Sequence, residues 1–196
     1  TFQQVLQNNT HLPIPEVFHL AFLEADKELN QNAGKHSGCT AIAAFLRTEE
    51  IKEGEVTNGK ENNTSTSEIV ETKKKFKRVL YTANVGDARA VLCRDGNAIR
   101  LSYDHKGSDA QEAKRIMDAG GFVMNNRVNG VLAVTRSLGD SSMKDFLWDV
   151  CDDQDAVDLI KDYTDPQKAS AKLLEHALQN FSTDNLSVMV VRLMNG

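Results

Sequence analysis

One stretch of this sequence, residues 79–101, constrains the fold more than any other. Its apolar and β-branched residues form three short runs, 79–85, 89–93 and 98–101. The pair Gly86-Asp87 separates the first two runs, and the pair Asp95-Gly96 separates the last two. An Asp-Gly loop of two residues favours the positive φ angles of a tight hairpin turn. The stretch therefore predicts three consecutive antiparallel strands.

Further strands are expected on both sides of this meander. Small and apolar residues fill 37–46 and predict a strand buried on both faces, although periodicity alone leaves a buried helix open. Residues 122–124 and 131–134 predict a second hairpin with Asn129-Gly130 as its turn. Apolar residues over 186–191 predict a last strand.

The helices interrupt the strands rather than alternate with them. Their signals are apolar residues at helical spacing, Ser108 or Asp as a first-turn cap, and Pro166 at a first helical position. The predicted helices span 13–31, 108–120, 152–162 and 165–180. This order predicts an α+β domain in which antiparallel sheets pack against helices.

The segment 48–75 differs from the rest of the chain. Glu, Lys, Asn, Ser, Thr and Gly dominate it, and it contains no aromatic residue. Because strands resume directly after it, the segment predicts a long mobile surface loop inside one domain, 1–196. Its basic end, 73–78, is either a docking or targeting patch or a solvated strand entry.

Composition narrows the class of protein. The chain has 196 residues, of which 40% are hydrophobic and 26% charged, as in ordinary soluble domains. A net charge of −5 argues against nucleic-acid binding, and no apolar run or leader points to a membrane or to secretion. We therefore expect a cytoplasmic or nuclear protein. The cysteines, Cys39, Cys93 and Cys151, predict buried free thiols rather than a disulfide framework.

Four aspartates stand at the ends of predicted strands: Asp87, Asp104, Asp140 and Asp184. Carboxylates gathered by loops at one end of a sheet suit Mg²⁺ or Mn²⁺, which prefer oxygen ligands. Gly-Asp and Asp-Asn pairs are also common in turns, so the residues alone leave both interpretations open.

Eight short motifs occur in order along the chain: 37–41, 83–89, 104–106, 119–121, 127–130, 132–140, 147–150 and 183–185. Together they resemble the type 2C (PPM-family) metal-dependent Ser/Thr protein phosphatases, most closely the fungal enzymes that act on MAP-kinase pathways. The resemblance covers nearly the whole chain except the polar loop.

The resemblance implies a fold of two packed antiparallel β-sheets flanked by helices, present here only in part. It implies two divalent ions, Mg²⁺ or Mn²⁺, with a third held more weakly, and a metal-activated water that attacks phosphorus. It also implies a monomer whose substrates are phosphoproteins, including MAP-kinase pathway components.

Site residues carry over by position. Asp184 matches a metal-binding aspartate, and Asp87 matches the aspartate of the third metal. Asn185 and Gly86 correspond to residues that support the metal-binding loops. Arg136, Gly139 and Asp140 lead into the flap beside the cleft, where substrate contacts are expected.

The chain departs from the family pattern at two places. The family's glutamate, Asp-Gly-His stretch, phosphate-binding arginine and general-acid histidine would precede Thr1, so no catalytic residue is identifiable here. Phe146 runs directly into Leu147, without the strand that carries another metal aspartate. We therefore expect an incomplete sequence, with residues omitted at both places and the Phe146 and Leu147 Cα atoms farther apart than the ~3.8 Å of bonded neighbours.

Two other functions remain open at this stage. A pseudophosphatase would keep the fold as a docking module without the metal centre. An independent regulatory or dimerisation unit would fold alone and elute as a defined oligomer.

Overall fold

A computed structural model describes residues 2–32, 38–51, 74–139, 151–182 and 186–193. Its helices are α1 (Phe2–Asn8), α2 (Ile14–Asn32), α3 (Ala110–Asp118), α4 (Asp153–Ile160) and α5 (Pro166–Gln179). Its strands are β1 (Gly38–Cys39), β2 (Ala41–Glu50), β3 (Phe76–Val85), β4 (Val91–Arg94), β5 (Asn97–Arg100), β6 (Val123–Met124), β7 (Arg127–Val128) and β8 (Leu138–Gly139).

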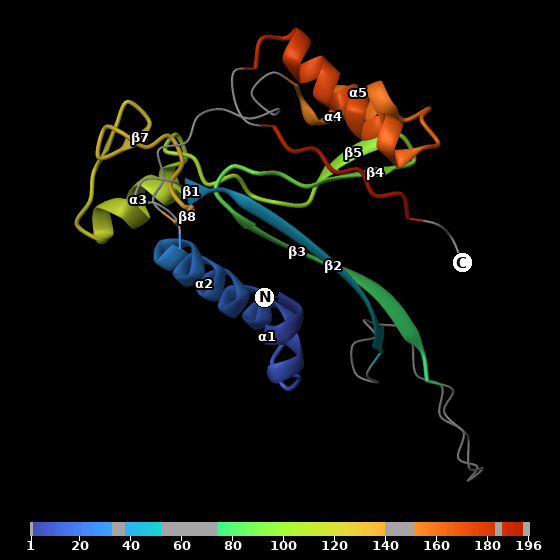
Figure 1. Cartoon of the computed structure of the whole chain (residues 1–196), viewed down its shortest axis with the longest axis horizontal. Helices are drawn as coiled ribbons and strands as arrows, with labels where there is room; N and C mark the ends of the chain where they lie inside the picture. The colour runs from blue at the N-terminus through green and yellow to red at the C-terminus, as the bar shows by residue number, and fades with distance from the viewer. Residues whose placement is uncertain (1, 33–37, 52–73, 140–150, 183–185, 194–196) are drawn as a thin grey trace, which may run out of the picture. The chain divides into compact units, whose positions relative to one another are not determined.

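The described strands pair as four two-stranded sheets, β1–β8, β2–β3, β4–β5 and β6–β7. The presence of these sheets together with five described helices confirms the mixed α+β class (Figure 1). The chain clusters into two compact units, Thr1–Ala43 with Thr82–Gly196, and Ala44–Tyr81. The prediction of a single domain over 1–196 stays a prediction.

The stretch 38–50 is strand and not helix. Exposed and half-buried residues alternate along β2, because β2 and β3 form a two-stranded ribbon. The prediction of a strand buried on both faces is therefore wrong. The ribbon extends beyond the start predicted for the polar loop, to Glu50, and an amide hydrogen bond of 2.8 Å joins Ile51 N to Lys75 O. Residues 52–73, which include most of the predicted loop, lie outside the described residues.

Within the shorter unit, Ala44–Tyr81, the ribbon carries its own polar pairs. Tyr81 Oη donates to Glu49 Oε1 over 2.7 Å, and Lys74 Nζ lies 3.2 Å from Glu50 Oε2. Because Glu49 and Glu50 are consecutive in β2, the two pairs lie on opposite faces of the ribbon.

The hairpin predicted at Asp95-Gly96 is confirmed. Both residues have positive φ, 52° and 79°, and β4 pairs with β5 in the register Arg94↔Asn97. In the described residues β3 pairs with β2 rather than with β4, so the expected three-stranded meander is wrong in its first pairing. Long-range pairing with β2 decided this, and a local pattern could not show it.

The second predicted hairpin has a different turn. Asn125 and Asn126, with φ of 52° and 60°, join β6 to β7. Asn129-Gly130, with φ of 51° and 73°, makes another turn that returns the chain to a Val128↔Leu132 bridge. Both turns use residues that tolerate positive φ. The prediction of a turn at Asn129-Gly130 is therefore correct, but the turn that joins the paired strands β6 and β7 is Asn125-Asn126.

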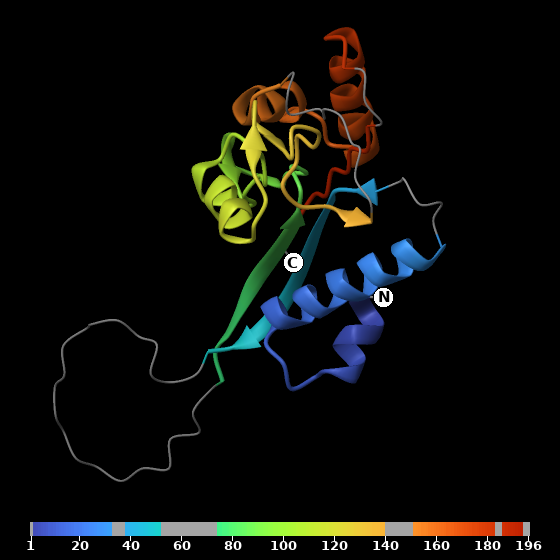
Figure 2. The same ribbon diagram turned by 90° about the vertical axis from the view of Figure 1, so that its left-hand side faces the viewer.

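The predicted helices are present, with shifted ends. α3 begins after Asp109, whose carboxylate accepts from Gln111 N and Glu112 N, so Ser108 is not the cap. α5 begins with Pro166 after the Asp165 cap, as predicted. α1 was not predicted. It lies against α2 (Figure 2). Its Val5 packs with Val17 and Ala21 of α2, and the rings of Phe2 and Phe18 lie 4.6 Å apart.

A second apolar cluster joins α4 and α5, which contact each other, while α4 also contacts β5 (Figure 1). It consists of Cys151, Ala156, Leu173 and Ala177, with Leu186, Val188 and Val190 against it. The predicted strand 186–191 therefore packs one face on these helices, but it is paired with no strand in the described part of the chain.

The three cysteines are free, as expected, but only Cys151 is buried. Cys93 is exposed; it lies close to the Asp95-Gly96 turn of a two-stranded hairpin, where it pairs with Ala98. None of the described helices combines the length and the apolar character that a bilayer span requires.

Candidate functional site

The turn at Gly86-Asp87, which follows β3, is held by contacts from three directions. Gly86 has φ of 91°, and a Cβ atom there would lie 2.2 Å from Thr40 Cγ2 and 3.0 Å from the carbonyl oxygen of Arg136. Gly86 O accepts from His105 N over 2.8 Å and from Asn84 Nδ2 over 2.9 Å. Only glycine combines this backbone conformation with so close an approach.

His105 supports the turn from the next loop. Its side chain is buried, and its Nδ1 lies 3.2 Å from Gly86 N and 3.1 Å from Gly86 O. The ring of Tyr103 meets the imidazole edge to face, with centroids 5.5 Å apart. Burial and the nearby Arg136 charge lower the pKa of His105, which favours the neutral ring. A neutral imidazole that is hydrogen-bonded to a turn has a structural role.

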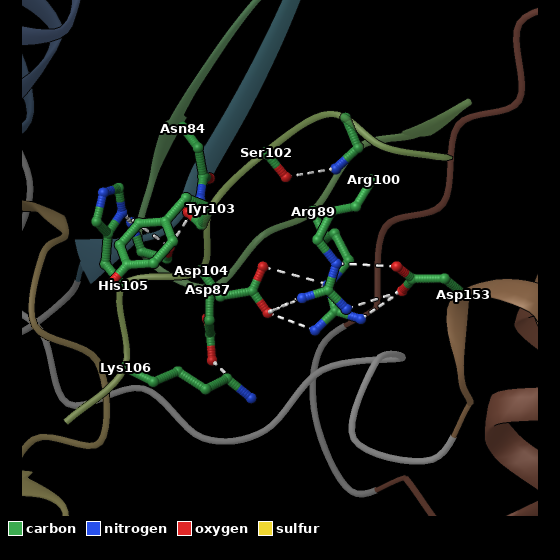
Figure 3. A network of polar contacts seen from close by, with 12 residues as sticks. Asn84, Asp87, Arg89, Arg100, Ser102, Tyr103, Asp104, His105, Lys106 and Asp153 are labelled. Carbon is green, nitrogen blue, oxygen red and sulfur yellow. Dashed lines mark hydrogen bonds and ion pairs between the residues drawn. The ribbon is translucent and has the colours of Figure 1, made fainter. Parts of the chain in front are cut away.

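Asp87 is buried, with 6% of its surface exposed. The ammonium of Lys106, on a side chain that is about one-third exposed, lies 3.7 Å from Asp87 Oδ2 (Figure 3). This separation is long for an ion pair, so the lysine compensates the carboxylate charge without binding it closely.

A second network of charges lies beside the turn. Arg89 is almost fully buried between two carboxylates (Figure 3). Its Nε and Nη2 atoms contact the carboxylate of Asp104, and its Nη1 atom lies 2.6 Å from Asp153 Oδ1. Arg100 is about half exposed and bonds Asp153 from the other side, over 2.8 Å. Because Asp153 begins α4, the network joins the loop of Asp104 to the first turn of that helix.

Glu112 of α3 is the third charged centre. It is 3% exposed, and its carboxylate accepts from Arg136, Arg115 and Thr135. Hydrogen bonds from Arg136 hold the pKa of Glu112 well below its usual range, although burial acts in the opposite direction, and Arg115 and Thr135 add to the effect. Glu112 is therefore ionised at neutral pH.

Comparisons with known proteins place this geometry in a family. The family model described as "Protein phosphatase 2C" matches residues 4–146 and 145–186. The chain is 42% identical over 214 residues to "Protein phosphatase 2C homolog 1" of Saccharomyces cerevisiae, with 96% of the chain and 72% of that protein covered. The chain belongs to the protein phosphatase 2C family.

Two further similarities extend this result. "Protein phosphatase 2C homolog 1" of Schizosaccharomyces pombe is 44% identical over 80% of the chain, which spans 46% of that protein's length. A solved structure of a phosphatase from Toxoplasma gondii superposes with a TM-score of 0.61, at 23% identity, over 93% of this chain and 76% of that one. This superposition shows the shared fold, in agreement with the α+β prediction.

The family match is interrupted where the sequence predicted an omission. The two matched segments meet at residues 145–146, and the alignment with the S. cerevisiae relative spans more positions than the chain has residues. The relative therefore has residues without a counterpart here. Residues 140–150 lie outside the described residues, so the predicted separation of Phe146 and Leu147 stays a prediction.

The described residues bring together part of the predicted protein phosphatase 2C site. Gly86 and Asp87 form the turn, and the Arg136 carbonyl lies against Gly86. Gly139 belongs to β8, and its amide donates to Asp26 Oδ1 of α2 over 2.7 Å. Asp140, Asp184 and Asn185 lie outside the described residues.

The carboxylates within the described ranges do not make a metal centre by themselves. No three His, Cys, Asp or Glu side chains converge there. Asp87 faces Lys106, and Asp104 is bound to Arg89. Two hard cations need more carboxylate oxygens than this arrangement supplies.

Sequence reasoning missed the roles of Lys106 and Glu112. Lys106 gave no signal, because its partner is 19 residues away along the chain. Glu112 did give one: it lies four residues before Ile116, on the same face of α3, and both side chains are buried. A glutamate on the apolar face of a helix predicts a partner with the opposite charge.

The depressed pKa of Glu112 makes stability depend on pH. The contribution of Glu112 is complete above about 4.3, the ordinary glutamate pKa, and is lost as the pH falls toward the lower folded value. We therefore expect the Glu112→Gln variant to lose less stability than the wild type between pH 5 and pH 3, as measured by urea unfolding. Parallel pH profiles for the two proteins would contradict this assignment.

Proposed function

We propose that the full-length protein is a protein Ser/Thr phosphatase that hydrolyses phosphoserine and phosphothreonine at a two-metal site. The observation that carries the proposal is the family match, whose two segments include Asp87, in the turn after β3, and Asp184, just before the last apolar segment. A phosphatase 2C domain that keeps both aspartates keeps the ligands of two different metal positions. This favours an active enzyme over a docking module.

The proposed ions are Mg²⁺ or Mn²⁺. When bound, paired divalent ions supply a nucleophilic water at neutral pH and stabilise charge on the phosphoryl oxygens. Asp184 and Asp87 are the ligands that this chain offers. We place a further carboxylate ligand in the segment absent between Phe146 and Leu147, because the described residues do not hold enough oxygen ligands.

The described residues suggest how Asp87 serves such a site. The turn is fixed by Thr40, His105 and the Arg136 carbonyl, so the Asp87 backbone position does not depend on the metal. The Lys106 ammonium, 3.7 Å away on a partly exposed side chain, can swing toward solvent when a cation takes its place. Asp87 thus has a neutralising partner both with and without the ion.

Hydrolysis of a phosphopeptide by the full-length protein tests the proposal. We expect activity with Mn²⁺ or Mg²⁺, its loss on chelation, and a decrease of about 100-fold in the Asp184→Ala variant, because a metal ligand is removed. Calorimetric titration with Mn²⁺ should show weaker binding by the same variant. Asp162→Ala, which removes an exposed aspartate after α4, is the control and should keep both properties.

Absence of metal-dependent activity in a folded, full-length protein would favour the pseudophosphatase instead. Activity that survives Asp184→Ala would overturn the site assignment alone. The two results separate an error about function from an error about ligands.

The finer assignments belong to the same proposal. Substrates include phosphorylated components of MAP-kinase pathways, the protein acts as a monomer, and it works in the cytoplasm or nucleus. Size-exclusion chromatography with light scattering tests the monomer, and a defined dimer would favour the regulatory-unit alternative. Phosphopeptides from kinase activation loops, compared with unrelated phosphopeptides, test the substrate class.

A further inference from the structure

Glu112 organises the charges at the start of the segment that leads to the predicted flap. Arg136 binds it with two nitrogens, Nε at 3.0 Å and Nη2 at 2.6 Å. Thr135 Oγ1 donates to the same carboxylate over 2.6 Å. Two neighbouring residues of this segment are thus tied to one side chain of α3. A two-pronged bond of this kind fixes both the position and the plane of a guanidinium.

Arg115 completes the arrangement from within α3. Its Nη2 donates to Glu112 Oε2 and to the backbone carbonyl of Thr135, each over 2.9 Å. The carboxylate of Glu112 therefore holds two guanidinium groups, one from its own helix and one from the 135–136 segment. The three side chains of Glu112, Arg115 and Arg136 together carry one net positive charge.

The two arginines also remain accessible. Their side chains are each 44% exposed, whereas that of Glu112 is 4% exposed. The Nη1 atom of each arginine makes no hydrogen bond within the part of the chain that the structure describes. Asp109 caps α3, and its hydrogen bond with Tyr103 raises the pKa of that tyrosine to about 12. Asp109 keeps its negative charge, but its carboxylate bonds neither arginine in the described part of the chain.

We propose that Glu112 is a positioning residue that fixes Arg136 and Arg115 as a pair of binding groups for a negatively charged part of the substrate peptide. This inference rests on the proposed phosphatase function. The guanidinium groups belong to α3 and to the 135–136 segment, whose backbone lies against Gly86 beside Asp87, so the peptide would bind next to the Asp87 turn. Removing Glu112 leaves both arginines charged but releases their orientation.

Steady-state kinetics of the full-length protein with Mn²⁺ test the inference. The variants are Glu112→Gln, Arg136→Ala and the double variant, each assayed on a phosphopeptide and on a small aryl phosphate ester. Glu112→Gln and Arg136→Ala should each raise KM for the phosphopeptide about tenfold, with kcat within about twofold. Because the small ester lacks the peptide, both variants should lose less kcat/KM on the small ester than on the phosphopeptide.

The double variant separates positioning from general stability. Because Glu112 acts through Arg136 and Arg115, the double variant should be much less impaired than the product of the two single effects. Asp118→Asn is the matched control. It removes a carboxylate from the same helix, in an exposed pair with Lys114, and should keep the wild-type KM.

Each outcome decides the question. An unchanged KM in Glu112→Gln, additive effects in the double variant, or parallel losses on peptide and ester would overturn the inference. A wild-type protein without activity on either substrate would instead refute the proposed function. If Glu112→Gln does not fold, Arg136→Lys replaces it in the test. Arg115 and Thr135 still bond Glu112 in that variant, but a lysine cannot make the two-pronged bond to the carboxylate. KM for the phosphopeptide should therefore rise although the positive charge at position 136 remains.

Discussion

Replacing Gly86 with alanine is expected to lower the free energy of unfolding by about 3 kcal/mol. Two penalties add at this position. A φ of 91° is unfavourable for any residue with a Cβ atom, and that atom would lie 2.2 Å from Thr40 Cγ2 and 2.6 Å from Thr40 Cβ. The carbonyl oxygen of Arg136 would lie only 3.0 Å from the same Cβ atom, so the side chain cannot move away from Thr40 in that direction. Relief requires β3 to separate from these neighbours, which also displaces Asp87.

Gly96 provides the matched control for this experiment. It has a similar φ, 79°, but a Cβ atom added there would meet nothing within 4 Å. Gly96→Ala should therefore cost only the conformational part, about 1 kcal/mol. Urea unfolding of the full-length protein measures both variants. Equal losses would show that close packing around Gly86 contributes nothing.

Replacing Arg89 with alanine is expected to destabilise the fold by about 3–5 kcal/mol, because it leaves Asp104 and Asp153 buried without their shared cation. The side chain of Arg89 is 8% exposed, and those of Asp104 and Asp153 are 10% and 19% exposed. Their charges cannot be compensated well by water. The loss should appear in urea unfolding and should include release of α4 from β5, which hydrogen exchange of the α4 amides would detect.

Arg100→Ala is the control for Arg89→Ala. Arg100 bonds the same Asp153, but its side chain is 45% exposed, so its removal should cost less than about 1 kcal/mol. Similar losses in the two variants would contradict the importance of burial at Arg89. Arg89→Lys should lose an intermediate amount of stability, because lysine keeps the positive charge but cannot contact both carboxylates as the planar guanidinium does.

Several elements could be predicted because their signals are local. Asp95-Gly96 specified its hairpin, since positive φ at two successive positions is a property of the residues themselves. Pro166 marked the first turn of α5 for the same kind of reason. The family motifs marked Gly86 and Asp87 as candidate site residues, and the structure places both in one turn that is packed against Thr40 and the Arg136 carbonyl.

Other features were predicted wrongly or not at all because competing local signals were equivalent. Ser108 and Asp109 can both cap a helix, and the carboxylate that reaches the free amides is that of Asp109. Asn125-Asn126 and Asn129-Gly130 both favour turns, and strand register selected the first for the β6–β7 pair. No local pattern distinguishes such alternatives.

The amino-acid sequence by itself determined the α+β class, the places of the main helices, the β4–β5 hairpin and the family. These depend on side-chain periodicity, on backbone preferences of single residues and on motifs that are contiguous in the chain. Only the tertiary structure decided that β3 pairs with β2, that Lys106 faces Asp87, and that Glu112 holds Arg136 from 24 residues away. Burial in the fold brings these charges together, and the cost of leaving a buried charge uncompensated selects their partners.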